Sequence, residues 1–243
     1  MARFVLVHGA FGGAWCWEPV VGPLEARGHT VETLDLPGGG DDPTPAAEVT
    51  LEGCVARVRE VLERGEPAVL VAHSMGGVVA TQAASESGDH VTALVFVASF
   101  MPADGQSLLD LTHLPEGEGD MIQANLRVEG EPPVATLPDD AAAVAIYNCC
   151  TPEQTRAALP RRRPQAVAPF ATPVQVDDAA LAAIPRFYVL TKQDNSIPQA
   201  LQRRMIAEHP CRDVVELDTD HAPYLSATDE LVEALDRFAR AAA

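Results

Sequence analysis

The chain has 243 residues, of which 47% are hydrophobic and 21% are charged, and its formal net charge at pH 7 is -18. This length allows one large domain with a sizeable core, and the composition is that of an ordinary globular protein. The negative charge excludes nucleic acid as an expected partner, because an acidic surface repels the phosphate backbone.

Short apolar runs alternate with helical patterns along most of the chain. The apolar runs predict six strands, at residues 3–7, 29–36, 68–72, 91–98, 186–190 and 214–217. The helical patterns predict helices at 18–28, at 51–62 after the N-cap Thr50, at about 76–87, at 199–208 and at about 228–240. The alternation predicts an α/β protein with a six-stranded, mostly parallel, doubly wound sheet that is covered by helices on both faces.

Residues 100–180 interrupt this alternation. Ten of the twenty prolines lie between Pro102 and Pro173, and the segment has no charge run or repeat typical of a disordered linker. We expect a small, partly helical cap inserted between the fourth and fifth strands, with residues 1–99 and 181–243 forming the core. The basic cluster RRR at 161–163 is interpreted as a solvated helix end; contact with an anionic substrate is the alternative.

The cysteines and the N-terminal stretch bear on location. The five cysteines show no paired metal-site spacing, and the neighbours Cys149 and Cys150 make a poor disulfide. We therefore expect reduced thiols, no metal and no cofactor. The stretch MARFVLVHGAFGG carries only a four-residue apolar run, too short for a signal peptide, and no segment is long enough to span a membrane. These features predict a cytoplasmic protein that binds no membrane, and they leave the oligomeric state open, a homodimer included.

Ser74 lies in VAHSMGGVV (71–79), where an apolar strand passes directly into a small-residue helix. Such a turn projects one side chain above the sheet edge, strains the backbone and requires small neighbours, here Ala72 and Gly76. The helix N-terminus behind Ser74 offers free N–H groups for developing negative charge. The pattern predicts a nucleophilic serine; the alternative is a serine that only caps the helix.

A nucleophilic serine needs a base, and the base needs a group that holds its tautomer. In open parallel sheets, reactive groups gather at the carboxyl ends of the strands. Asp194 follows the fifth strand in TKQDNSIP, and His221 follows the sixth in DTDHAPY. Two other acids, Asp218 and Asp220, are alternatives to Asp194, although Asp220 adjoins His221, which makes mutual orientation awkward.

Other histidines compete with His221. His8 and His73 also lie near the serine turn. We expect His8 to hold the first loop by backbone hydrogen bonds and His73 to point away, because the neighbours of a serine at such a turn diverge. The glycine-rich loop HGAFGG (8–13) allows close backbone approach, and the N–H groups of Ala10 and Met75 are candidates to bind an oxyanion.

With these pieces, the sequence resembles the α/β-hydrolase superfamily, and within it the branch of plant methylesterases, salicylate-binding esterases, hydroxynitrile lyases and bacterial esterase relatives. The resemblance is carried by FVLVHGAFGGAWCW (4–17), VLVAHSMGGVV (69–79), FVASFMP (96–102), LTKQDNSIP (190–198) and DHAPYLS (220–226). It implies that Ser74 is the nucleophile, His221 the general base and Asp194 its orienting acid, with the oxyanion hole at Ala10 and Met75. It also implies the sheet order 2-1-3-4-5-6.

The resemblance leaves a choice between lyase and esterase. The hydroxynitrile lyases of this branch carry a threonine after the first-loop histidine and a lysine after the catalytic histidine, where this chain has Gly9 and Ala222. We therefore expect a serine esterase that cleaves a small or medium carboxylic ester through an acyl-enzyme. A cyanohydrin lyase, a non-hydrolytic small-ligand receptor and a cofactor-free oxygenase are the alternatives. The candidate pocket walls are Phe11, Trp15, Phe100, Met101, Tyr147 and Tyr224.

Overall fold

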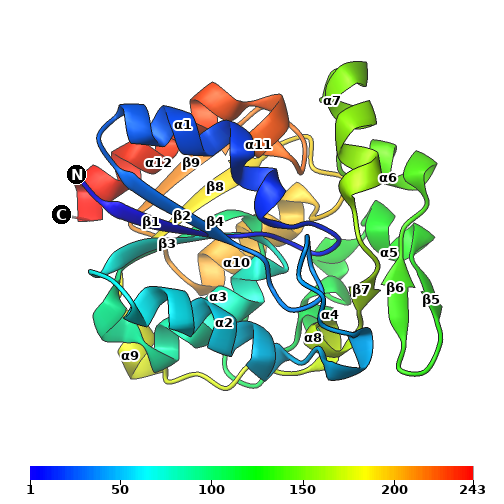
Figure 1. Cartoon of the computed structure of the whole chain (residues 1–243), viewed down its shortest axis with the longest axis horizontal. Helices are drawn as coiled ribbons and strands as arrows, with labels where there is room; N and C mark the ends of the chain where they lie inside the picture. The colour runs from blue at the N-terminus through cyan, green and yellow to red at the C-terminus, as the bar shows by residue number, and fades with distance from the viewer. Residues whose placement is uncertain (243) are drawn as a thin grey trace.

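A six-stranded sheet forms the centre of the computed structural model, which describes residues 1–242 (Figure 1). Its strands are β1 (Arg3–Val7), β2 (Thr30–Leu34), β3 (Ala68–Ser74), β4 (Val91–Ser99), β8 (Arg186–Thr191) and β9 (Asp213–Leu217). Their order is β2-β1-β3-β4-β8-β9, and all five neighbouring pairs are parallel. The predicted sheet order is confirmed, and it places β1 and β3 side by side.

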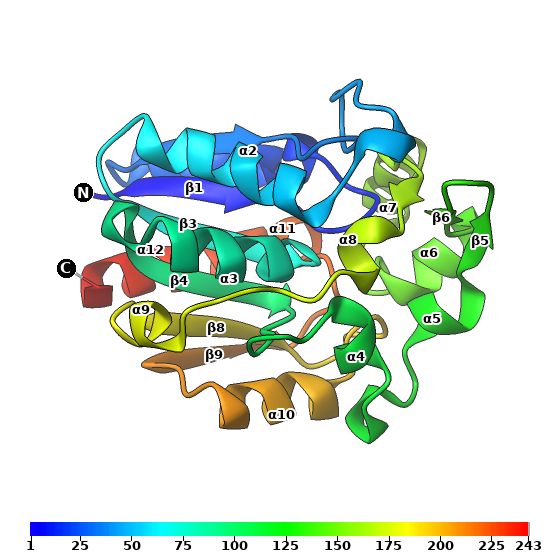
Figure 2. The ribbon, with the colours of Figure 1, turned by 90° about the horizontal axis from the view of Figure 1, so that it is seen from below.

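Helices cover both faces of this sheet. They are α1 (Glu18–Ala26), α2 (Leu51–Glu63), α3 (Gly76–Glu86), α10 (Gln199–Glu208), α11 (Pro223–Ser226) and α12 (Thr228–Ala242). α1 and α12 lie on one face, and α2 and α3 lie on the other (Figures 1 and 2). Among residues 1–242, no helix combines the length and the apolar character that crossing a bilayer requires.

The core is built from the apolar strands and the inward faces of the helices. Every residue of β3 is buried, as expected for a central strand that is covered on both faces. On the α12 side, Phe187 of β8 stacks on Phe238 with ring centroids 4.8 Å apart. Burial of this apolar surface, at about 25 cal/mol per Å², is the main force that holds the strand ends in place.

The segment between β4 and β8 forms the cap beyond the carboxyl ends of the strands (Figure 1). Its helices are α4 (Leu108–Thr112), α5 (Met121–Asn125), α6 (Asp139–Ala145), α7 (Pro152–Ala158), α8 (Ala168–Ala171) and α9 (Asp178–Ala182). It also contains an antiparallel sheet of β5 (Arg127–Glu129), β6 (Val134–Thr136) and β7 (Gln165–Ala166), which the sequence did not predict. The cap is therefore a mixture of helices and a small sheet.

The end of the 100–180 segment returns to the core. Gln175 N donates to Gln82 Oε1 at 3.2 Å, and Asp177 N donates to Ser85 Oγ at 2.7 Å, both on α3. α9 then lies next to α3, at the end of the sheet opposite the other cap helices (Figure 2). The part of the segment that covers the strand ends is therefore shorter than the whole range.

Candidate active site

Ser74 occupies a sharp turn between β3 and α3. Its φ of 53° lies in the left-handed region, which is costly for a residue with a side chain. The turn brings the backbone of α3 against the first loop, because a Cβ placed on Gly76 would lie only 2.6 Å from the carbonyl oxygen of His8. The strained turn that the sequence predicts is present, and it holds the Ser74 hydroxyl at the carboxyl end of the sheet.

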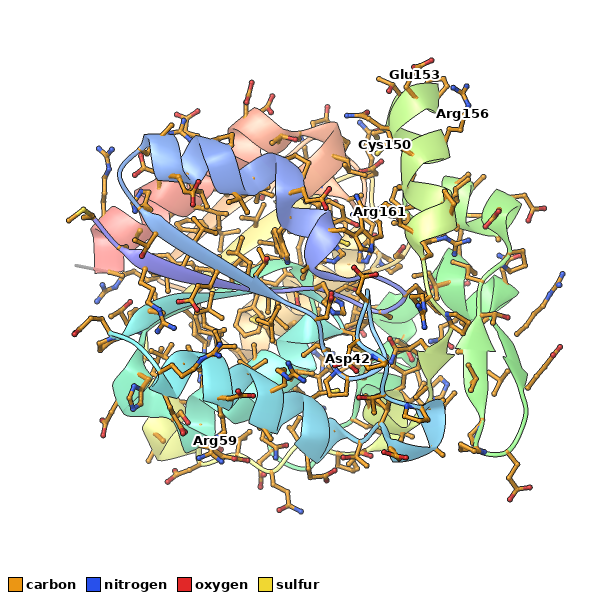
Figure 3. All side chains as sticks on the ribbon, in the orientation of Figure 1. Asp42, Arg59, Cys150, Glu153, Arg156 and Arg161 are labelled. Carbon is orange, nitrogen blue, oxygen red and sulfur yellow. The ribbon has the colours of Figure 1, made fainter. Side chains whose placement is uncertain are left out.

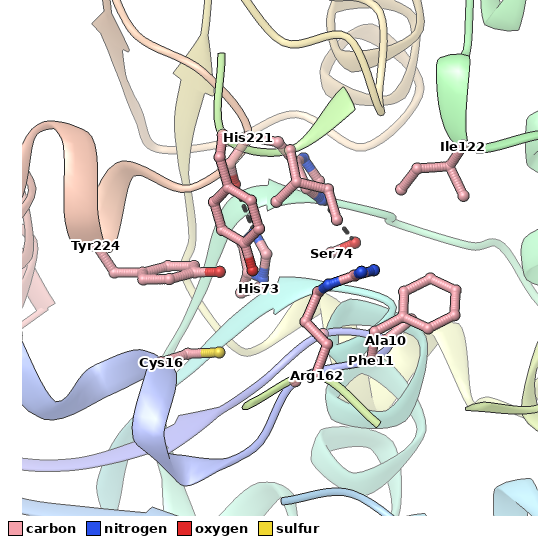
Figure 4. A pocket seen from close by; sticks show the side chains of 13 residues that line it. Ala10, Phe11, Cys16, His73, Ser74, Ile122, Arg162, His221 and Tyr224 are labelled. Atoms are coloured by element: carbon pink, nitrogen blue, oxygen red, sulfur yellow. Dashed lines mark hydrogen bonds between the residues drawn. The ribbon is translucent and has the colours of Figure 1, made fainter. Parts of the chain in front are cut away.

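His221 and Asp194 reach the Ser74 side of the sheet from the loops that follow β9 and β8. Figure 4 shows the His221 ring directed at the Ser74 hydroxyl. His221 Nε2 lies 3.0 Å from Ser74 Oγ, and His221 Nδ1 lies 2.9 Å from Asp194 Oδ2. All three residues are buried. Because a carboxylate only accepts, Nδ1 carries the proton and Nε2 is free to accept the hydroxyl proton of Ser74. The arrangement is that of a nucleophile, its base and an orienting acid.

Asp194 is fixed by donors on both carboxylate oxygens. Its Oδ1 accepts from the backbone N–H groups of Ser196 and Ile197, each at 2.8 Å, and its Oδ2 also accepts from Thr191 Oγ1 at 2.8 Å. These bonds fix the direction of the carboxylate. The loop after β8 therefore holds the acid ready to orient the His221 ring.

The two rival acids face other groups. Asp220 accepts from Cys149 N at 2.6 Å and from Ser226 Oγ at 2.6 Å, so it ties the cap to the end of α11. Asp218 is exposed and pairs with Lys192 at 3.7 Å. The geometry therefore favours Asp194 over both as the partner of His221.

The two rival histidines form hydrogen bonds to backbone groups around the site. His8 Nε2 accepts from Leu36 N at 3.0 Å, and its Nδ1 lies 2.8 Å from Gly9 O, so it braces the first loop. His73 Nε2 lies 2.7 Å from the carbonyl oxygen of His221, to which it donates. Burial lowers the pKa of His8 and holds the pKa of His73 well below its usual value, so both rings stay neutral.

The first loop places backbone donors beside Ser74. Ala10 borders both pockets next to the serine, and Met75 borders one of them. Among the turn and loop contacts of residues 1–242, neither N–H group donates to another backbone carbonyl. Phe11 has a φ of 61°, and its carbonyl accepts from Arg163 N at 2.9 Å, so the cap holds this strained loop. The two N–H groups are therefore positioned as a candidate oxyanion hole.

Ser74 lies between two pockets of different character. The first, here called the polar pocket, has a cavity volume of about 20 Å³ and is bordered by Gly9, Ala10, Phe11, Gly12, Cys16, His73, Ile122, Ile146, Tyr147, Arg162, His221 and Tyr224. The second, here called the apolar pocket, has a cavity volume of about 30 Å³ and is bordered by Ala10, Phe11, Met75, Phe100, Leu108, Thr112, Asp120, Ile122, Gln123, Leu126, Phe170, Ser196 and Ile197. Each pocket has room for a small substituent on one side of a ligand bond that lies next to Ser74.

Four of the six predicted pocket walls border these pockets, and two do not. Phe11, Phe100, Tyr147 and Tyr224 line one or both pockets. Trp15 instead lies in a short 3-10 turn (Ala14–Trp17) under the guanidinium of Arg161, 4.9 Å from its ring centroid. Met101 is buried against α10, where its N–H points to Met205 Sδ at 3.3 Å. Neither residue borders the pockets beside Ser74.

Several pocket residues were not predicted. Ile122, Leu126 and Phe170 come from cap helices or their ends, whose positions no local pattern gives. The interpretation of RRR as a solvated helix end is wrong for Arg162, whose side chain is only 8% exposed and lines the polar pocket. The chain turns inward there, after a 3-10 turn at Leu159–Arg161, to enter β7.

Asp120 adds an acid to the apolar pocket. Burial raises its pKa to about 6, although its carboxylate accepts from the N–H groups of Ile122 and Gln123.

Across residues 1–242, no three His, Cys, Asp or Glu side chains are grouped so as to hold a metal ion. The chemistry available at this site is that of an activated hydroxyl beside backbone donors.

The fold and this geometry define the class of the protein: the chain belongs to the alpha/beta hydrolase family, whose model matches residues 4–234. Among its relatives, Methylesterase 7 of Arabidopsis thaliana is 32% identical over 98% of this chain and 97% of its own length. Esterase PIR7B of Oryza sativa subsp. japonica is 33% identical over 98% of this chain and 95% of its own length. The predicted resemblance to the methylesterase branch is confirmed.

Solved structures agree with this placement. A pyrethroid hydrolase from Sphingobium faniae JZ-2 superposes with a TM-score of 0.89 at 28% identity, covering 99% of this chain and 98% of that one. A mutant of polyneuridine aldehyde esterase gives 0.88 at 25% identity, covering 98% of each chain. Some relatives are longer, since the chain spans only 64% and 54% of the length of two chloroplastic relatives from Arabidopsis thaliana.

Proposed function

We propose that this protein is a serine hydrolase that cleaves a carboxylic ester through an acyl-enzyme. The observation that carries the proposal is the continuous chain of hydrogen bonds from Ser74 Oγ through His221 to Asp194, at 3.0 and 2.9 Å. The neutral hydroxyl of serine is a weak nucleophile, and a neighbouring oriented imidazole is the group that activates it. The relatives named as esterases and as a hydrolase support the same reaction.

The proposed reaction uses two proton transfers. His221 Nε2 takes the proton of Ser74 as Oγ attacks the ester carbonyl, and Asp194 stabilises the resulting imidazolium. The N–H groups of Ala10 and Met75 hold the oxyanion, and each such donor contributes about 3 kcal/mol to the transition state. His221 then protonates the leaving alcohol. In the second half it activates a water molecule that releases the acid from Ser74.

The substrate of the proposed reaction is a small ester. The two pockets have cavity volumes of only about 20 and 30 Å³, so neither admits a large rigid group without movement of the cap. A methyl ester fits this limit because its leaving group is methanol. The names of the plant methylesterase relatives support methyl esters as the first substrates to test.

The lyase alternative receives no support from the site. A Cβ at Gly9 would lie 2.7 Å from Ser74 Cβ, so a threonine does not fit there without displacing the serine. Ala222, which stands where the lyases carry a lysine, is fully buried and supplies no cation for a cyanide leaving group. The esterase proposal therefore rests on the groups that the site contains.

Ser74→Ala tests the proposal. The variant is expected to lower kcat for a panel of methyl esters and for an aryl acetate by about 10⁴-fold or more, because it removes the nucleophile. An unchanged circular dichroism spectrum would show that the fold is intact. Turnover that survives in Ser74→Ala contradicts the proposal. Cyanide release from mandelonitrile by the wild-type protein, oxygen uptake, or tight binding of an ester without product formation would also contradict it.

A cytoplasmic location is part of the proposal. It is supported by the five cysteines, all of which are free within residues 1–242. Fractionation of the source cells, followed by detection of the protein, tests it. Recovery from a secreted or organelle fraction would contradict it.

A further inference from the structure

Arg162 brings a guanidinium into the polar pocket from the cap. It follows the 3-10 turn Leu159–Arg161, and its side chain is only 8% exposed. It borders the same pocket as Ser74 and His221, and Figure 4 shows its head group directed into the space beside Ser74. A buried arginine at this place has no part in the proposed proton transfers, so its presence requires another explanation.

The outer nitrogens of Arg162 have partners, and the inner one does not. Nη1 donates to the carbonyl oxygen of Leu137 at 3.0 Å, and Nη2 pairs with the carboxylate of Asp139. Nε is buried and has no hydrogen-bond partner among residues 1–242. The two outer bonds fix the plane of the guanidinium and leave the N–H of Nε without an acceptor. A buried unsatisfied donor on a charged group is costly, so an acceptor from a ligand is the expected partner.

The surroundings of Nε favour an anion. The polar pocket is bordered by no aspartate or glutamate, whereas the apolar pocket contains Asp120. Burial raises the pKa values of Tyr147 and Tyr224 and raises that of Cys16 to about 11, so all three side chains remain protonated and neutral. Asp139, which pairs with Arg162 from outside, has a side chain that is 72% exposed, so water screens its charge. The polar pocket therefore presents donors and one buried cation.

We propose that the substrate is an ester that carries a free carboxylate, which enters the polar pocket and accepts a hydrogen bond from Arg162 Nε. This inference rests on the proposed function and names its substrate class. Arg162 is then a specificity-determining residue, since it binds the substrate away from the bond that is cleaved. The cavity volume of about 20 Å³ limits the carboxylate arm to a few atoms. The half esters of short dicarboxylic acids meet both conditions.

The test compares two isosteric substrates in matched variants. Monomethyl glutarate is the charged substrate, and the same ester with its carboxylate replaced by a primary amide is the neutral one. The wild-type protein is expected to show a kcat/KM ratio of about tenfold or more in favour of the charged ester, because charge-assisted hydrogen bonds are among the stronger ones. Arg162→Met should bring this ratio close to one, mainly through KM of the charged ester.

Two controls separate recognition from a structural role. Arg161→Met removes the neighbouring arginine, which pairs with Glu18 at 2.7 Å and lies where the cap meets α1 (Figure 3); it should leave the ratio unchanged. Asp139→Asn removes the outer carboxylate but not Nε, so it should keep the preference for the charged ester. If Arg162→Met lowers kcat/KM for both substrates equally, or if Arg161→Met has the same effect, the inference is wrong.

A binding measurement keeps the inference independent of turnover. Calorimetry with monomethyl glutarate is carried out on Ser74→Ala and on Ser74→Ala combined with Arg162→Met. About tenfold weaker binding in the double variant supports the inference, and equal binding overturns it. If neutral esters are hydrolysed but the charged ester is not preferred, only this inference fails. If the wild-type protein turns over no ester while Arg162 still governs binding, the proposed function fails.

Discussion

His73 connects the strand that ends at Ser74, the proposed nucleophile, to His221, the proposed base. Its Nε2–H donates to the carbonyl oxygen of His221 at 2.7 Å, and the two rings lie 4.7 Å apart between centroids. Because the His73 ring is buried and neutral, this bond fixes the backbone of His221 without adding charge beside it. His73 is therefore a positioning residue and does not take the proton of Ser74.

His73→Phe is expected to lower kcat by about tenfold with little change in KM, because the unpartnered carbonyl releases the backbone of His221. The free energy of unfolding should fall by about 1–3 kcal/mol. His73→Gln retains an N–H donor and should restore most of kcat. Steady-state kinetics and urea unfolding measure both effects. Equal kcat values in the Phe and Gln variants would show that the hydrogen bond has no positioning role.

Asp120 predicts a dependence of stability on pH. Its pKa is raised from 3.8 to about 6 by burial, so the folded state holds the proton more tightly than the unfolded state. The resulting stabilisation is fully present below pH 3.8 and is lost as pH rises through about 6. Asp120→Asn removes this loss while its side-chain oxygen still caps α5. The variant should therefore gain about 1–3 kcal/mol relative to wild type between pH 4 and pH 7.5. Unfolding by urea at the two pH values measures the difference, and parallel curves would contradict it.

The residues that meet at the site were unequally predictable. Ser74 ends one strand, and Asp194 and His221 follow the ends of two others. A pattern of apolar runs and the rule that parallel strands end together were therefore sufficient to propose them. Arg162 and Ile122 come from the cap, where the direction of a side chain depends on how short segments pack. The triplet RRR gives no sign that its middle member turns inward and its neighbours do not. Local sequence therefore predicted the groups that are proposed to react and several pocket walls, but it missed the cap residues Arg162 and Ile122.

The helices show how local signals set element boundaries. Thr50 was predicted as the N-cap of α2, and its Oγ1 accepts from Gly53 N at 3.0 Å. Thr50→Ala should lower the free energy of unfolding by about 1 kcal/mol, because it leaves an N–H group at the helix start without its partner. Thr50→Ser keeps the hydroxyl and serves as the control. Urea unfolding measures both, and kcat should stay the same, since α2 contributes nothing to either pocket. A loss in Thr50→Ser equal to that in Thr50→Ala would contradict the capping explanation.

The strands of the central sheet and the strands of the cap differ in how much the sequence reveals. β1, β3, β4 and β8 are mostly buried apolar runs, whereas the edge strands β2 and β9 are partly exposed. The predicted bounds of all six strands agree with the structure to within about two residues. β5 and β6 have three residues each and β7 has two, and β5 is exposed along its whole length. Such short strands bury too little surface to show an alternating pattern, so pairing between distant segments decides them.

The net negative charge of the molecule opposes folding. The chain carries 35 acidic and 17 basic residues, and several of the basic ones are used in exposed ion pairs, such as those of Arg59 with Glu63 and Glu86. Isolated pairs of this kind each contribute only about 0–1 kcal/mol. The unpaired acids repel one another over the folded surface more strongly than in the expanded chain. Added salt should therefore stabilise the protein, because its screening of the general repulsion outweighs its weakening of the pairs.

Salt weakens the repulsion between acidic side chains because the screening length falls from about 30 Å in 0.01 M salt to about 8 Å in 0.15 M salt. A gain of about 1 kcal/mol corresponds to a Tm increase of roughly 2–4 °C for a chain of this size. Thermal unfolding in sodium chloride and in potassium chloride measures it, and the two salts should act alike. The control is a variant in which Glu118, Glu129 and Glu131, which are exposed and make no ion pair among residues 1–242, are replaced by lysine. Its net charge is less negative, so its Tm should rise less with salt; an equal or larger rise would mean that general repulsion is not the cause.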